Sequence, residues 1–172
     1  MDDKETLRKR MRLVRDLVDD RLLRSVQLWG DVATTPEYAE ASTVMAFVGT
    51  SGEPDTEGLF ARMRADGKTL LLPRIVDDLI TPTLLGGGLV PGAFGVPEPT
   101  GESCAASALD LVIVPGLAFT TEGGRLGRGG GHYDRFLAHC AAPSIGVCFA
   151  EQLVDELPLE PHDIRVGRIV SA

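Results

Sequence analysis

The sequence of 172 residues has no long apolar run and few cysteines. No apolar stretch approaches the roughly 20 residues that cross a bilayer, and the charged, amphipathic first residues lack the apolar core of a signal peptide. The three cysteines, Cys104, Cys140 and Cys148, show no CxxC spacing, which argues against a disulfide framework and against a structural zinc site. We therefore expect a soluble, cytoplasmic protein with free thiols and no membrane partner.

Positive charge is also scarce, and it is unevenly spread. The 17 Lys and Arg residues face 25 Asp and Glu residues, for a formal net charge of −8. A dedicated nucleic-acid binder usually carries a basic face that dominates its total charge, so we expect no nucleic-acid partner. Two segments oppose the trend, because residues 4–15 hold six positive charges and one negative, and residues 125–135 hold three and one. The chain is therefore acidic with two small basic segments.

The apolar pattern predicts one α/β domain over residues 1–172. Apolar residues recur every three or four positions from Leu7 to Trp29, the period of one long helix or of two consecutive helices with a buried face. Because apolar strands alternate with helices, we expect a mostly parallel sheet covered on both faces. Further helices are expected over 56–66, with Thr56 as N-cap, and over 133–140. Strands are expected over 43–48, 69–73, 80–85, 109–115, 144–149 and 164–170. Residues 86–103 are expected to form an extended surface excursion.

The most distinctive segment is a glycine-rich loop that follows the most continuous apolar strand. Residues 123–131 hold six glycines together with Arg125 and Arg128. Glycines allow positive φ, which turns backbone N–H groups inward as an anion-binding nest, and the helix N-terminus that follows adds partial positive charge. The loop predicts a phosphate site at the carboxyl end of a strand, although His132 follows the last glycine and neither the Walker nor the Rossmann pattern is met. A flexible surface loop is the less favoured alternative.

These residues carry a resemblance to a known family. Residues 110–119, DLVIVPGLAF, and 124–137, GRLGRGGGHYDRFL, resemble the signature of the 5-formyltetrahydrofolate cyclo-ligase (methenyltetrahydrofolate synthetase) family. The resemblance implies a three-layer α/β/α fold, with N-terminal helices packed on a mostly parallel central sheet. It also implies an enzyme that uses Mg²⁺ and ATP to convert 5-formyltetrahydrofolate to 5,10-methenyltetrahydrofolate, with release of ADP and phosphate. Separately, we expect a monomer, although no motif of the sequence reports the oligomeric state. Weaker matches lie at Lys4-x-x-x-Arg8, 52–56, 72–74, 95–99, 151–154, 157–158 and 162–163.

The resemblance further implies roles for individual residues, with Arg125 and Arg128 as the catalytic cations. The implied ATP contacts are Lys4, Arg8, Arg125, Leu126, Gly127, Arg128, Gly129, Gly130, Gly131, His132 and Tyr133. The implied folate contacts are Val48, Glu53, Arg128, Gly129, Gly130, Gly131 and His132, and the implied Mg²⁺ ligands are Asp134 and Asp163. Because Lys4 and Arg8 are four apart on one helix face, both can reach one polyphosphate. We expect them to meet Arg125 and Arg128 at one cleft.

Plainer interpretations stay open for several of these residues. Lys4 and Arg8 fit a solvated helix face, and Asp134 fits a helix N-terminus stabilised through the dipole. Asp163 fits a simple turn, and Glu53 fits an exposed strand end. Three residues depart from the family pattern, namely Thr120, His132 and Gly167.

Two other functions also fit the sequence. One is a non-catalytic relative that binds folate or nucleotide. The other is a phosphosugar isomerase-like enzyme, since a similar architecture serves such work and a fold alone does not set function.

Overall fold

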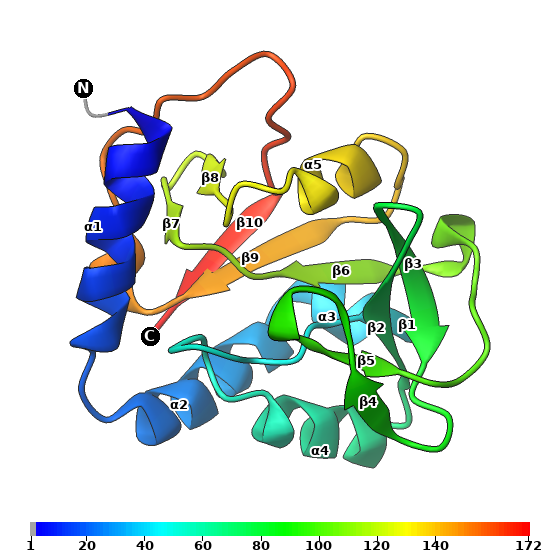
Figure 1. Cartoon of the computed structure of the whole chain (residues 1–172). Helices are drawn as coiled ribbons and strands as arrows, with labels where there is room; N and C mark the ends of the chain where they lie inside the picture. Colours follow the sequence, from blue (N-terminus) through cyan, green and yellow to red (C-terminus); the bar gives the residue numbers. More distant parts are fainter. Residues whose placement is uncertain (1–2) are drawn as a thin grey trace.

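The computed structural model describes residues 3–172, in which a six-stranded sheet is covered by helices (Figure 1). The strand order is β10-β9-β6-β1-β2-β3, and only the β2–β3 pair is antiparallel. The strands are β1 (Thr43–Met45), β2 (Thr69–Val76), β3 (Leu79–Leu84), β6 (Leu111–Val114), β9 (Ser144–Cys148) and β10 (Arg168–Ser171). The helices are α1 (Lys4–Asp16), α2 (Arg21–Ala33), α3 (Pro36–Glu40), α4 (Glu57–Ala65) and α5 (His132–Leu137). The predicted α/β fold with a mostly parallel sheet is confirmed.

Both faces of the sheet are buried because successive strand residues point to opposite sides. In β6, Leu111 and Ile113 belong to the core beneath α2, α3 and α4, which also contains Trp29 and Met63. Val112 and Val114 belong to the opposite core. That second core includes Phe136 and Leu137 of α5, so the sheet forms the middle of three layers.

Helix α1 packs beside the sheet rather than on it. Its buried residues Leu7 and Met11 contact a third core that contains Leu117, Ala118 and Leu126. Ala118 and Leu126 belong to a short hairpin of β7 (Ala118–Phe119) and β8 (Arg125–Leu126), which Leu117 directly precedes and which lies next to α1 in Figure 1. The expectation that the N-terminal helices pack on the sheet therefore holds for α2 and needs correction for α1. The hairpin leads directly into the glycine-rich loop, so α1 lies beside that loop.

The N-terminal helical pattern is divided into α1 and α2 by a turn at Asp20, whose φ is +52°. Thr56 occupies the N-cap position of α4, but its hydroxyl accepts a hydrogen bond from the Gly49 N–H (3.1 Å) instead of capping the helix. The last strand begins at Arg168, four residues later than expected. No helix within residues 3–172 combines the length and the apolar character that a membrane span requires.

The segment expected as a surface excursion forms a second hairpin, of β4 (Leu89–Pro91) and β5 (Pro97–Pro99). The hairpin packs against β2. Strand β3 tolerates Pro82 because it is the edge strand of the sheet. Together β2, β3 and the β4–β5 hairpin form one wall of the site described below.

Candidate active site

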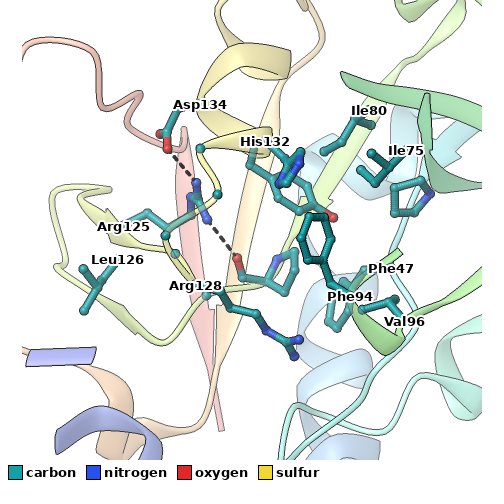
Figure 2. A pocket seen from close by; sticks show the side chains of 18 of the residues that line it. Phe47, Ile75, Ile80, Phe94, Val96, Arg125, Leu126, Arg128, His132 and Asp134 are labelled. Carbon is teal, nitrogen blue, oxygen red and sulfur yellow. Dashed lines mark hydrogen bonds and ion pairs between the residues drawn. The ribbon is translucent and has the colours of Figure 1, made fainter. Parts of the chain in front are cut away.

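A cavity of about 570 Å³ lies at the carboxyl ends of the strands (Figure 2). Phe47 and Val48 follow β1 and line it, as do Pro115 and Gly116, which follow β6. The glycine-rich loop, α1 and the β4–β5 hairpin supply the other walls. This is the edge at which open α/β sheets bind ligands.

The two basic segments meet at this cavity. Lys4 and Arg8 from α1 line it together with Arg125 and Arg128 from the loop. The Arg8 Nε donates a hydrogen bond to the carbonyl oxygen of Gly127 (3.0 Å), which fixes the helix to the loop. The expected convergence of four cations in one cleft is therefore observed. Every residue of 125–134 lines the same cavity, as do Val48, Glu53 and Asp163.

Glycine is required at two positions of the loop. Gly129 has a φ of +113° and Gly131, the N-cap of α5, has a φ of +67°. Residues with a Cβ rarely adopt these conformations. A Cβ on Gly129 would also lie 3.5 Å from the guanidinium carbon of Arg8. That distance is an ordinary van der Waals contact, so the positive φ angles rather than crowding require glycine here.

Each predicted site carboxylate is paired with a predicted site cation. The pairs are Lys4 Nζ with Asp163 Oδ2 (2.7 Å), Arg125 Nη2 with Asp134 Oδ2 (3.2 Å) and Arg128 Nη2 with Glu53 Oε1 (2.8 Å). The exposed fractions of the three acidic side chains are 11% for Asp163, 16% for Asp134 and 7% for Glu53. Because an unpaired buried charge is costly, these pairs neutralise the site, and an anionic ligand would have to exchange partners within it.

The two predicted metal ligands are held in different ways. Asp134 Oδ1 accepts a hydrogen bond from the Ile164 N–H (3.1 Å), while its other oxygen faces Arg125. Burial tends to raise the pKa of Asp163, but hydrogen bonds from Lys4 and from the Glu160 N–H lower that pKa below its usual value. Among residues 3–172, the cluster that could hold a metal ion consists of Glu160, His162 and Asp163, whose candidate ligand atoms all lie within 4.8 Å of one another. Asp134 is not a member of this group.

Tyr133 and His132 close the cavity at the start of α5. The Arg125 guanidinium lies over the Tyr133 ring, 5.4 Å from its centroid. The Tyr133 hydroxyl is buried without a hydrogen-bond partner among the described residues, and burial raises its pKa. His132 Nε2 lies 2.9 Å from Asp78 Oδ1, and its ring lies 5.3 Å from that of Phe94.

Of the three departures from the family pattern, only His132 lines the cavity. The Thr120 hydroxyl accepts a hydrogen bond from the Gly124 N–H (3.0 Å) and so closes the turn between β7 and β8. The N–H of Gly167 donates to the Ser144 hydroxyl (3.0 Å). These two residues shape loops outside the cavity.

Sequence reasoning missed an apolar wall of the cavity, to which Ile75, Ile80, Phe94 and Val96 contribute (Figure 2). Phe94 is 76% exposed and adopts a φ of +56°. Its neighbours 95–99 belong to one of the weak family matches, which is the one signal that could have drawn attention to it. Arg15 was also missed, and its contacts are described below.

A mostly parallel α/β sheet with a cationic glycine-rich loop over a partly apolar cavity defines an α/β protein with a cationic ligand cavity. A model of the 5-formyltetrahydrofolate cyclo-ligase family matches residues 1–172. The 5-formyltetrahydrofolate cyclo-ligase of Mycolicibacterium smegmatis is 36% identical over 141 residues, covering 75% of this chain and 73% of the relative. That of Escherichia coli is 33% identical over 150 residues, covering 80% and 82%.

A solved structure points the same way. The NMR structure of Aquifex aeolicus 5,10-methenyltetrahydrofolate synthetase matches with a TM-score of 0.86 and 32% identity, covering 98% of this chain and 89% of that one. The chain therefore belongs to the 5-formyltetrahydrofolate cyclo-ligase family, which confirms the resemblance.

Proposed function

We propose that the chain converts 5-formyltetrahydrofolate to 5,10-methenyltetrahydrofolate at the expense of ATP, with release of ADP and phosphate. Family membership supports the reaction. The observation that carries the proposal is the composition of the cavity. One end gathers four cations around a glycine-rich loop, and another wall is apolar and aromatic. A polyphosphate and a flat heterocycle are the two kinds of ligand that such walls suit.

The chemistry explains why ATP is needed. The formyl group on nitrogen is an amide, whose oxygen is a poor leaving group. Attack of this oxygen on the γ-phosphorus of ATP forms an O–P bond and releases ADP. The neighbouring amine of the folate then attacks the formyl carbon and loses its proton, while the C–O bond breaks and phosphate leaves. The two steps close the ring and leave the methenyl bridge.

Phosphoryl transfer depends mainly on positioning and on cations around the transferred group. Arg128 is the exposed cation, with 40% of its side chain accessible, and its guanidinium points into the cavity (Figure 2). Arg125 is buried and fixed between Asp134 and the Pro115 carbonyl oxygen. We assign both to the transferred phosphoryl group, and Lys4 and Arg8 to the remaining phosphates. The adjoining loop residues provide backbone contacts to ATP.

The folate would lie between the loop and the apolar wall. Glu53 can accept hydrogen bonds from the pterin N–H groups, and Val48, which follows β1, lines the same cavity. Phe94 presents an exposed ring for stacking. His132 lies next to Phe94 and at the end of the glycine loop, and we assign it to the formyl end of the folate.

The donor set fits Mg²⁺, which prefers carboxylate oxygens. Asp134 and Asp163 would hold it, and Glu160, which also contacts Lys4, offers a further oxygen. When bound, Mg²⁺ neutralises negative charge on the ATP phosphates. Binding of ATP would give Lys4 and Arg125 phosphate partners in place of Asp163 and Asp134. The carboxylates are then released from their present cations.

The test is formation of the methenyl product, followed by its absorbance, from 5-formyltetrahydrofolate with and without ATP. Product and ADP should form in equal amounts, only with both substrates, and removal of divalent cations should stop both. No ADP above background with this folate would overturn the proposal. Tight binding of both ligands in calorimetry without turnover would instead indicate the non-catalytic relative.

A further inference from the structure

Arg15 is a buried, charged residue of α1 that does not line the cavity. Its side chain is 5% exposed, and Nη2 donates a hydrogen bond to the Ser51 carbonyl oxygen. Nε and Nη1 are buried and make no hydrogen bond to any described residue. Nη1 lies 3.8 Å from Glu53 Oε1, an ion-pair distance. Burying an arginine with unused donors is costly, and the ion pair with Glu53 is the interaction that offsets this cost.

Glu53 therefore lies between two arginines that differ in their freedom to move. Arg128 reaches Oε1 at 2.8 Å from the cavity side, and 40% of its side chain is exposed. Arg15 approaches the same oxygen from the protein interior, where it is enclosed. The other oxygen, Oε2, accepts a hydrogen bond from the Thr50 N–H (3.0 Å). Of the two cations, only Arg128 can leave without unpacking α1.

The proposed reaction requires this departure. Arg128 cannot neutralise the transferred phosphoryl group while it remains bound to Glu53. Its removal would leave a carboxylate with 7% exposure without its closest cation, which is unfavourable for a buried charge unless another cation replaces it. Arg15 Nη1, which makes no hydrogen bond to a described residue, already lies 3.8 Å from the same oxygen, so a small shift of either side chain would let Arg15 take over.

We infer that Arg15 is a positioning residue for folate recognition, acting as the fixed counter-ion of Glu53 when Arg128 turns toward the phosphoryl group. The inference rests on the proposed function and deepens it. Folate N–H groups and Arg128 compete for Glu53 Oε1, so folate binding releases Arg128 toward ATP. By linkage, each ligand then raises the affinity for the other.

The turn between β1 and Glu53 supports this role of Arg15. Ser51 and Gly52 both adopt left-handed conformations, with φ of +50° and +81°. The hydrogen bond from Arg15 to the Ser51 carbonyl oxygen holds this turn. A Cβ on Gly52 would lie 3.3 Å from Arg15 Nε, so the turn and the guanidinium are in close contact. Arg15 thus fixes both the charge and the backbone of the segment that presents Glu53.

The test compares Arg15→Met and Arg15→Lys with the wild type. Calorimetry measures the Kd of 5-formyltetrahydrofolate and of a non-hydrolysable ATP analogue, each alone and with the other ligand present. Arg15→Met should weaken folate binding by about tenfold or more, leave binding of the analogue alone unchanged, and reduce the mutual enhancement. Arg15→Lys, which keeps the charge, should recover part of the loss.

Two further variants separate positioning from a general structural effect. Glu53→Gln combined with Arg15→Met should bind folate no more weakly than Glu53→Gln alone, because both changes remove one interaction. Arg24→Met is the matched control, since Arg24 also pairs with a glutamate, Glu151 (2.7 Å), and with a backbone carbonyl, that of Ala172 (2.7 Å). Arg24 does not line the cavity, so its loss should leave both Kd values unchanged.

The outcomes distinguish the inference from the proposed function. If the wild type does not bind 5-formyltetrahydrofolate, the proposed function is wrong. If the wild type binds it and Arg15→Met binds it equally well, only the inference is overturned. Additive losses in the double variant, or equal losses for folate and the ATP analogue, also overturn it. If Arg15→Met does not fold, the comparison of single and double variants is made with Arg15→Lys and Glu53→Gln instead.

Discussion

At the scale of the residue, Arg128 combines exposure, charge and a replaceable partner. Its side chain contributes to no core, and Arg15 remains as a second cation beside Glu53, so we expect Arg128→Ala to leave the thermal midpoint close to that of the wild type. Loss of a cation at the transferred phosphoryl group should lower kcat by about 100-fold or more. Steady-state product formation and thermal melting of the same preparation measure the two effects. Arg168→Ala is the matched control, because Arg168 is 44% exposed and pairs with Glu37 (2.9 Å) away from the cavity.

Two results would contradict this assignment of Arg128. If Arg128→Ala lost cooperative melting together with activity, the arginine would be structural. An unchanged kcat in a folded variant would remove Arg128 from the phosphoryl site.

Single residues also show what the sequence could and could not reveal. Leu7, Met11 and Arg15 follow one another at intervals of four and lie on one buried face of α1. An arginine on an apolar face is the signal that could have revealed Arg15, but its partner depends on the fold. Glu53 comes from a turn 38 positions later in the chain. No local pattern shows that two such segments meet.

At the scale of the element, the β4–β5 hairpin brings an exposed aromatic ring to the cavity. We expect Phe94→Ala to weaken binding of 5-formyltetrahydrofolate by about three- to tenfold, the range expected for loss of an aromatic stacking contact. Binding of the ATP analogue alone should be unchanged, because the hairpin lies on the opposite wall from Lys4 and Arg8. Calorimetry with the two ligands measures the difference.

Val90→Ala is the control for this hairpin, since Val90 is 47% exposed on β4 and does not line the cavity. Equal losses of folate affinity in Phe94→Ala and Val90→Ala would show that the hairpin, rather than the ring, matters. Parallel losses for folate and the ATP analogue would contradict a folate-specific role.

The elements themselves were predictable to different degrees. Helical period and apolar runs located α1, α2, β2 and β6, because burial of one face or of both faces leaves a direct pattern. The β4–β5 hairpin was missed because glycine and proline dominate residues 86–103, both strands are only three residues long, and β4 is exposed. The position of α1 against β7 and β8 was also out of reach, since an apolar stripe shows that a helix is buried and not what buries it.

At the scale of the whole molecule, the charges explain why an acidic chain can bind two anionic ligands. The net charge of −8 is distributed so that residues 4–15 and 125–135 meet at one cavity. The fold brings these segments together through the contact between α1 and the β7–β8 hairpin. The charge pattern marked the two segments, the family resemblance gave the expectation that they meet, and the tertiary contact determined where they do so.

The same charges predict how stability depends on pH. Several carboxylates have a pKa below the usual value. That of Asp110 is lowered by hydrogen bonds from the Thr43 and Ser42 N–H groups, and that of Glu151 by its hydrogen bonds with Arg24. For such groups the unfolded state binds protons first as the pH falls, so their stabilisation is complete above the ordinary pKa of about 4 and is lost below it.

The thermal midpoint should therefore be nearly constant from neutral pH to about pH 5 and fall steeply below about pH 4. Melting curves recorded across this range measure the effect. Glu151→Gln removes one of the titrating groups, so this variant should start from a slightly lower midpoint at neutral pH and lose less of it in acid. A midpoint that stayed level to about pH 3, or that rose on acidification, would show that the native carboxylates bind protons at least as readily as those of the unfolded chain. In that case the ion pairs that join α1 and α2 to residues 151–163, Lys4 with Asp163 and Arg24 with Glu151, contribute nothing to the free energy of folding.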